Sequence, residues 1–230
     1  MRPRSAPHGD SGQYQDHVSG DWALTAAAQK KSLTASERET PRGRQLRQRF
    51  RQRLRTWPRP RLKFLDETGV TINLTPRYGR AAPGVRVVEP VPRNYGQQLS
   101  LLAVLSPCGL SAPMTIEGPV DAAVFRRYVE CVLGPTLRPG DIVVMDNLAV
   151  HKVAGIAERI QACGARVEYL PPYSPDFNPI EQAWSKLKTA LRQRKARTRR
   201  TLERALTVLL PTISGSDARA WFHHCGYSLH

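Results

Sequence analysis

Hydrophobic residues in the middle of the chain fall into short runs with the spacing of β-strands. The run "LKFLDE" (62–67) is apolar and ends in carboxylates, and "GVTINLT" (69–75) alternates apolar with polar residues. Strict alternation is the pattern of a half-buried strand. Further along, "QQLSLLAVLS" and "LSAPMTIEG" are two apolar runs that turn at "PCG". Together these runs predict three successive strands in an antiparallel meander.

The pattern changes after residue 120, where helical and strand-like spacing alternate. "DAAVFRRYVECVLGPT" has apolar residues at helical spacing, and "DIVVMDN" is a β-branched core strand. A helix over "VAGIAERIQACG" and a strand over "RVEYLPP" follow, and further helices are predicted over about 179–194, 198–210 and 216–224. This order predicts an α/β fold, with a mixed five-stranded sheet flanked by helices and extra helices at the C-terminal end.

The N-terminal quarter has a different pattern. Residues 1–30 are rich in Ser, Gly, Asp, Gln and His with little periodicity, and we predict that they are disordered. Residues 31–60 are predicted to form a basic helical linker. Leu46, Phe50 and Leu54 recur every four residues in a helix that Pro58 ends.

The net charge of the chain indicates what kind of partner it binds. The 230 residues carry 35 Lys and Arg against 19 Asp and Glu, a net charge of +16, which favours a polyanionic partner and nucleic acid above all. No apolar run approaches the ~20 residues that a membrane span needs, and the N-terminus lacks the apolar core of a secretory signal. The four cysteines are widely spaced, which fits a reducing cytoplasm and suggests neither a zinc site nor a disulfide framework.

Three carboxylates stand where strands end or a helix begins. Asp66 ends the first predicted strand, Asp146 ends the fourth, and Glu181 opens the helix after the fifth. Ligands gather at the carboxyl ends of strands in open α/β sheets, and the first and fourth strands should be neighbours. We therefore expect Asp66 and Asp146 to lie side by side. Two close carboxylates repel each other unless a cation lies between them, and oxygen ligands suit Mg²⁺ or Mn²⁺.

Each of these carboxylates also has an ordinary interpretation. Asp66 and Asp146 could be turn residues at strand ends. Glu181 could belong to a capping box, with Asn178 as the N-cap and Pro179 as the first helical residue. Taken together on this strand order and charge, the three favour a metal site. Two ions about 3.5–4 Å apart would suit phosphodiester chemistry, and therefore cleavage or transfer of nucleic-acid strands.

Other carboxylates compete with these three by residue type. Glu67 follows Asp66, and adjacent strand residues point to opposite faces, so only one of the pair can face a given site. Asp176 lies in a loop bounded by prolines and is as well placed to form a turn. Asp141 stands at the start of its strand, which is the wrong end.

Several motifs resemble those of a known family. "FLDETG", "YGRAAPG", "LRPGDIVVMDNLAVHK", "ARVEYLPPYSPDFNPIEQAWSKLK" and the closing "HHCGY" resemble the transposases of bacterial insertion sequences related to the mariner superfamily, the DDE endonucleases. The likeness runs from about residue 30 to residue 230. Thirty-four residues separate Asp146 from Glu181, a spacing typical of this superfamily.

The resemblance implies a fold, an activity and a set of partners. It implies a ribonuclease-H-like catalytic domain over 61–230, with Asp66, Asp146 and Glu181 as catalytic triad and ligands of two Mg²⁺ (or Mn²⁺) ions. The implied reactions are hydrolysis at the ends of a DNA element and attack of the released 3′-OH on target DNA. The implied setting is a homodimer on DNA, associated with the nucleoid in a bacterial cytoplasm.

Candidate DNA contacts lie around the triad. Trp184, one turn after Glu181, is expected to pack in the core. Basic residues continue along the same predicted helix, which favours contact with phosphates. The candidates for DNA binding are Asn147, His151, Lys152, Tyr173, Ser174, Lys186, Lys188 and Arg192.

One feature departs from the family pattern. Only 65 residues precede Asp66, where family members usually carry helix-turn-helix DNA-binding domains of more than a hundred residues. The segment 31–60 would then be the remnant of such a region, in a truncated copy or the second of two reading frames. Two alternatives therefore stay open: a DNA-binding remnant without catalytic activity, and a ribonuclease-H-like nuclease that acts on RNA–DNA hybrids.

Overall fold

Five strands form one mixed sheet in the computed structural model, which describes residues 35–228 apart from residues 95 and 97. The strands run in the order β3-β2-β1-β4-β5, as the sequence predicts. Their bounds are β1 Leu62–Val70, β2 Leu99–Ser106, β3 Gly109–Glu117, β4 Ile142–Met145 and β5 Arg166–Tyr169. β1, β2 and β3 are antiparallel neighbours, whereas β4 pairs parallel with both β1 and β5. The predicted disorder of residues 1–30 falls outside the described residues.

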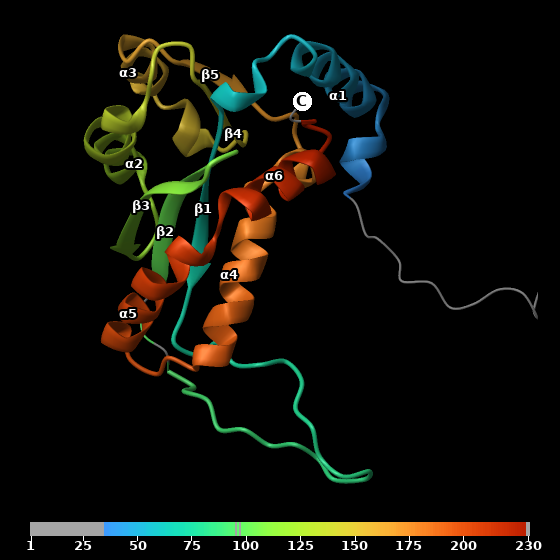
Figure 1. Cartoon of the computed structure of the whole chain (residues 1–230), viewed down its shortest axis with the longest axis vertical. Helices are drawn as coiled ribbons and strands as arrows, with labels where there is room; N and C mark the ends of the chain where they lie inside the picture. Colours follow the sequence, from blue (N-terminus) through green and yellow to red (C-terminus); the bar gives the residue numbers. More distant parts are fainter. Residues whose placement is uncertain (1–34, 95, 97, 229–230) are drawn as a thin grey trace, which may run out of the picture. The chain divides into compact units, whose positions relative to one another are not determined.

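Helices cover both faces of the sheet (Figure 1). Their bounds are α1 Pro41–Leu54, α2 Ala122–Tyr128, α3 Ile156–Ala162, α4 Ile180–Arg194, α5 Arg199–Leu209 and α6 Gly215–His224, and a π-helical turn Val129–Leu133 extends α2. Alternate strand residues divide between two buried clusters. Phe64 and Val144 pack with α1, α4, α5 and α6, whereas Leu65 and Val143 pack with α2 and α3. Because side chains alternate along a strand, even-numbered residues of β1 and β4 face α4.

The first strand differs from its prediction. "LKFLDE" belongs to a single nine-residue strand that ends at Val70, and Ile72 and Leu74 lie beyond it, partly buried against the core. Asp66 therefore lies within β1 and does not end it. The parallel pairing with β4 stops at Leu65, while the antiparallel pairing with β2 continues to Val70. Asp66 is thus at the end of the parallel pairing only.

Helix α1 is part of the same packing unit as the sheet. That unit runs from Ala35 to His230, and the division at residue 60 into a linker and a catalytic domain stays a prediction. Phe50 of α1 is fully buried, with its ring 5.5 Å from Trp57 and 5.2 Å from Phe177. The Arg47 side chain is buried as well and pairs with Asp176.

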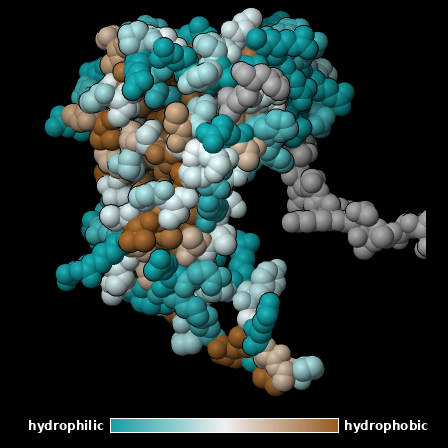
Figure 2. Space-filling view, in the orientation of Figure 1, coloured by the Kyte–Doolittle hydropathy of each residue, from teal (hydrophilic) through white to brown (hydrophobic). Residues whose placement is uncertain are grey.

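A long segment without strand or helix joins β1 to β2. It carries the exposed apolar residues Tyr78, Val85, Val87, Val88 and Val91. Figure 2 shows hydrophobic residues at its far end, away from the sheet. Among the helices that the structure describes, none is long and apolar enough to cross a membrane.

Candidate active site

Asp66 and Asp146 lie beside each other on neighbouring parallel strands. The last residue pair in the register of β1 and β4 is Leu65 with Met145, and each aspartate follows directly. Neighbouring strands are about 4.8 Å apart, so the two carboxylates start from adjacent backbone positions. Asp66 contacts Trp184 of α4, and Asp146 lines a cavity together with Glu181 of the same helix. The structure thus brings together the pair that strand order predicts.

Asp66 is the more buried of the two, with 9% of its surface exposed. Its Oδ1 accepts a hydrogen bond from the backbone N–H of Glu67 (2.8 Å). Its Oδ2 accepts one from Asn178 Nδ2 (3.2 Å) and one from Trp184 Nε1 (3.3 Å). Burial, followed by the negative charges of Glu181 and Asp146, raises the pKa of the Asp66 carboxyl to about 7 despite these donors. Near neutral pH this carboxylate is poised between its two protonation states.

Asp146 is held through one oxygen. Oδ1 accepts a hydrogen bond from the backbone N–H of Leu148 (3.1 Å), which makes the aspartate a turn residue as well as a site residue. The same Oδ1 lies 2.6 Å from Nδ1 of His151, outside hydrogen-bond angles. The imidazole is buried, with its ring 4.6 Å from that of Phe125 in α2. Both of these contacts go to Oδ1, and the residue lines one of the cavities of the site.

Glu181 stands in the first turn of α4, and the capping-box interpretation is wrong. The N-cap position is Pro179, and no side chain caps the helix. Asn178 instead turns its amide to Asp66, as described above. Glu181 is solvent-exposed, yet partial desolvation and the charge of Asp146 raise its pKa, while Lys188 acts in the opposite direction. Its side chain is therefore free for a ligand.

The three carboxylates fit a divalent cation by their chemistry. They are hard oxygen donors, and burial, followed by the negative charges of Glu181 and Asp146, raises the pKa of the Asp66 carboxyl. Among the described residues, however, no three His, Cys, Asp or Glu side chains are gathered closely enough to hold one ion. One coordination sphere shared by all three therefore requires a side-chain rotation.

Two cavities meet at Glu181. One, of about 410 Å³, is lined by Asp146–Leu148, the loop Leu170–Pro175, Asn178 and Glu181. The other, of about 590 Å³, runs along α4 past Lys188 and Arg192 to the loop residues 76–78. Glu181 is the residue that both cavities share, so the carboxylate site opens in two directions.

Comparisons with known proteins identify the family and the fold. A family profile described as DDE superfamily endonuclease matches residues 61–203, more than half of the chain. The chain belongs to the DDE superfamily endonucleases. The comparison with curated protein sequences found no match.

Solved structures of Mos1 transposase share the fold of this DDE endonuclease. The Mos1 strand transfer complex matches with a TM-score of 0.71 at 16% identity, over 88% of this chain and 64% of that chain. The Mos1 paired-end complex with Mg matches at 0.70 and 15%, over 89% and 66%. The catalytic domain of Mos1 mariner transposase matches at 0.58 and 15%, over 85% and 92%. The chain thus spans less than two thirds of the protein in the first two structures, and the predicted ribonuclease-H-like fold is confirmed.

The structure sorts the predicted DNA contacts of the DDE endonuclease. Asn147, Tyr173, Lys188 and Arg192 line the two cavities and reach solvent. Lys152 is exposed outside both, with Nζ 5.5 Å from the centre of the Tyr169 ring. These five residues have the exposure that a DNA contact needs.

Three other predicted contacts are engaged elsewhere. His151 is buried against Asp146, so its side chain is not available to DNA. Ser174 lines a cavity but is buried, and its hydroxyl accepts a hydrogen bond from Arg47 (2.7 Å). Lys186 is paired with Asp217 (2.7 Å) on the α6 side of α4, outside the cavities at Glu181.

Sequence reasoning missed the residues that hold Asp66. Asn178 was interpreted as a helix cap and Trp184 as core packing, and both donate hydrogen bonds to the carboxylate. Trp184 is indeed buried, so that interpretation is confirmed but incomplete. The available signal was polarity, because a buried indole N–H usually finds an acceptor.

We expect His151 to be a positioning residue for Asp146. His151→Phe retains a ring against Phe125 but loses the nitrogen beside the carboxylate. Losing such an outer partner of a metal ligand lowers metal affinity or activity about 10–100-fold. The half-saturating Mg²⁺ concentration for DNA nicking should therefore rise, while the melting temperature stays close to that of the wild type. An unchanged Mg²⁺ requirement would show that the contact serves only packing.

Proposed function

We propose that this DDE endonuclease domain cuts DNA at the ends of a mobile element and joins the released 3′-OH to target DNA. One observation carries the proposal: Asp66 and Asp146 directly follow the last paired residues of two parallel strands, and the negative charges of Glu181 and Asp146 both act on Asp66, while Asp146 and Glu181 line one cavity. The family match and the fold shared with Mos1 transposase structures support it.

The catalytic residues are Asp66, Asp146 and Glu181. Ions of Mg²⁺ or Mn²⁺, two in the mechanism proposed here, would activate the attacking oxygen and stabilise the leaving one. Asp66 would supply the buried ligand, which Asn178 and Trp184 orient. Asp146 would supply the second, with Oδ1 held by the N–H of Leu148 and lying beside His151. Glu181 brings its carboxylate from the rim of both cavities. The half-buried cations Lys188 and Arg192, which line the larger cavity, attract the DNA backbone.

A nicking assay on the purified chain tests this proposal. The substrate is duplex DNA that carries the element's ends, incubated with Mg²⁺ or Mn²⁺, and we expect 3′-OH products. Glu181→Gln removes the charge of one ligand and keeps its shape, and should lower the nicking rate about 1,000-fold, since metal-assisted charge stabilisation contributes several kcal/mol. Glu203→Gln, which removes a half-exposed carboxylate of α5 that pairs with Arg199, is the matched control.

The other outcomes of this assay identify the alternatives. Salt-sensitive, sequence-independent DNA binding without nicking, unchanged by Asp146→Ala, would identify a non-catalytic remnant. Preferential cleavage of an RNA–DNA hybrid placed beside the duplex would identify a ribonuclease-H-like nuclease. Either result would replace the transposase proposal.

We also propose that two copies act together on DNA. The proposal rests on the resemblance alone, and mass measurement in solution tests it. Light scattering on the chain with and without end-containing DNA should give two protein copies in each complex. A single copy on DNA that is nevertheless nicked would contradict it.

A further inference from the structure

The larger of the two cavities at Glu181 has walls from different parts of the chain. On one side lies α4, with Glu181, Lys188 and Arg192 spaced at seven and four residues, so that they form a single stripe. On the other side lie Pro76, Arg77 and Tyr78 of the segment between β1 and β2. The cavity holds about 590 Å³ and begins at the proposed catalytic glutamate.

The walls carry the chemistry of a surface that binds unpaired nucleic acid. Lys188, Arg192 and Arg77 are cations that can contact phosphates along the cavity. Tyr78 is an aromatic residue with 90% of its surface exposed. An exposed ring beside cations suits a base whose face is free, because bases in a duplex already stack on their neighbours. This combination distinguishes the cavity from a basic surface that holds only the duplex backbone.

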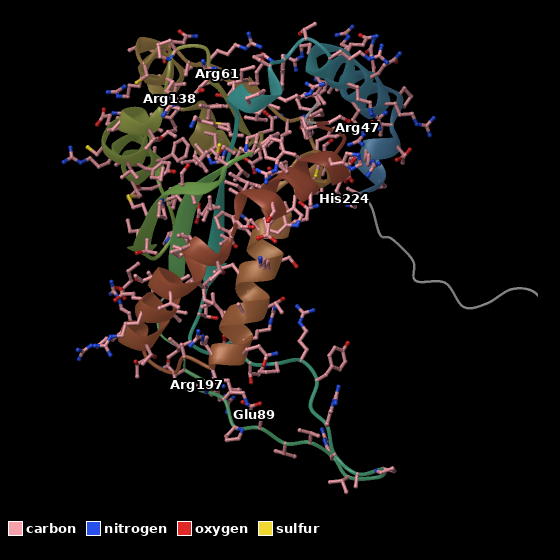
Figure 3. All side chains as sticks on the ribbon, in the orientation of Figure 1. Arg47, Arg61, Glu89, Arg138, Arg197 and His224 are labelled. Atoms are coloured by element: carbon pink, nitrogen blue, oxygen red, sulfur yellow. The ribbon has the colours of Figure 1, made fainter. Side chains whose placement is uncertain are left out.

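One residue fastens the outer wall. Nη1 of Arg197, in the connection between α4 and α5, donates to the backbone oxygens of Ile72 (3.2 Å) and Leu74 (2.8 Å). Nη2 donates to Oε1 of Glu89 (3.4 Å), which also pairs with Lys195 (2.9 Å). Figure 3 shows Arg197 and Glu89 next to each other at the base of the segment. Arg197 thus connects two parts of the segment between β1 and β2 to the end of α4. One part contains Ile72 and Leu74, just before Arg77 and Tyr78, and the other is Glu89, where the chain returns.

We propose that this cavity binds an unpaired stretch of the DNA strand that enters the carboxylate site, and that Arg197 is the positioning residue for its outer wall. The inference rests on the proposed function for the identity of the substrate. Its test is binding without catalysis, so the two can fail separately. A chain that nicks DNA but does not use this cavity would refute only the present inference.

A matched pair of arginines provides the first test. Arg77 lines the cavity, whereas Arg86 is exposed on the same segment outside it. Fluorescence anisotropy in EDTA would compare Arg77→Gln and Arg86→Gln on a short single-stranded oligonucleotide and on a blunt duplex of the same sequence. We expect Arg77→Gln and Tyr78→Ala each to weaken single-strand binding about tenfold. Arg86→Gln should change it less than about twofold, and the duplex should respond equally to both arginine changes. Equal effects on the single strand would overturn the proposal.

The second test addresses the role of Arg197. Arg197→Ala should weaken single-strand binding as much as Arg77→Gln does. The double variant, Arg77→Gln with Arg197→Ala, should bind the single strand no more weakly than the weaker-binding of the two single variants, because both changes act through one wall of the cavity. Arg200→Ala, an exposed arginine on α5, is the control for lost charge. Arg197→Lys keeps the charge but loses the forked donor geometry, so it should behave like Arg197→Ala. Additive losses, or full binding by Arg197→Lys, would show that Arg197 contributes charge alone.

Discussion

Replacing Asp66 with asparagine is expected to abolish DNA nicking and, at the same time, to make the protein more stable at pH 8. The loss of activity follows from removing the charge of a proposed metal ligand, which should lower the rate about 1,000-fold or more. The gain in stability follows from the pKa of Asp66, which is about 7 in the folded chain because the carboxylate is buried and faces Glu181 and Asp146.

The direction of the pH effect follows from this raised pKa. The folded state binds the Asp66 proton more tightly than the unfolded chain, whose carboxyl has the ordinary value of 3.8. The contribution to stability is therefore fully present below pH 4 and is lost as the pH rises through about 7. The difference of about three pKa units corresponds to about 4 kcal/mol of unfolding free energy at most.

Asparagine should recover part of that free energy. It carries no charge, but its single oxygen cannot accept from both Glu67 N–H and the pair Asn178 and Trp184. One unsatisfied buried donor costs about 1–3 kcal/mol, which leaves a net gain of about 2 kcal/mol at pH 8. Thermal melts should show an increase of about 4–8 °C at pH 8 that shrinks toward pH 5. Added Mg²⁺ should stabilise the wild type and have little effect on Asp66→Asn.

Asp141 is the matched control at the opposite end of the same parallel strand pair. It is even more buried but faces cations: its carboxylate lies 3.7 Å from Arg61 and 3.6 Å from Lys63, and accepts from Arg138 N–H. Asp141→Asn should therefore destabilise the protein by about 1–2 kcal/mol and leave nicking unchanged. If Asp66→Asn were also destabilising at pH 8, the proposed repulsion among the three carboxylates would be contradicted.

The difference between these two aspartates illustrates what the sequence could predict. Periodicity gave the strand order, and strand order placed Asp66 and Asp146 at the end where parallel strands offer a site, with Asp141 at the wrong end. These inferences depend on local spacing and on topology alone. They hold although the first strand extends beyond Asp66 to Val70.

The partners of these residues could not be predicted, because they depend on tertiary distances. Asn178 follows a proline-rich loop and has the pattern of a helix cap, but the approach of α4 to β1 gives its amide a charged acceptor. His151 follows "MDNLAV" and was predicted to contact DNA, but its side chain is buried beside Phe125. Periodicity indicates which face of a helix or strand is buried. It does not indicate which polar atoms of other elements contact the side chains on that face.

Removing the carboxylate of Asp176 is expected to be among the most destabilising single changes at the edge of the site. Arg47 of α1 is buried and pairs with both oxygens of Asp176 (3.0 and 2.6 Å) while it donates to Ser174. Its guanidinium also stacks 4.3 Å from the centre of the Phe177 ring. Asp176→Ala leaves a buried cation without its counter-charge, and such a loss costs about 3 kcal/mol or more. In a chain of this size that lowers the melting temperature by about 6–12 °C.

The same ion pair fixes the loop that lines the smaller cavity and leads to Asn178, so Asp176→Ala should also reduce nicking. Arg47→Met should destabilise less, because Asp176 is 38% exposed and water can solvate it.

Burial would raise the pKa of Asp176, but the hydrogen bonds and charge of Arg47, with Arg38, outweigh it and lower the pKa. This stabilisation is therefore present above about pH 4 and is lost as the pH falls further. Glu168→Ala removes the partner of Arg53, a half-exposed arginine of the same helix, and should cost less than about 1 kcal/mol. Equal losses from Asp176→Ala and Glu168→Ala would mean that α1 is held by its apolar residues alone.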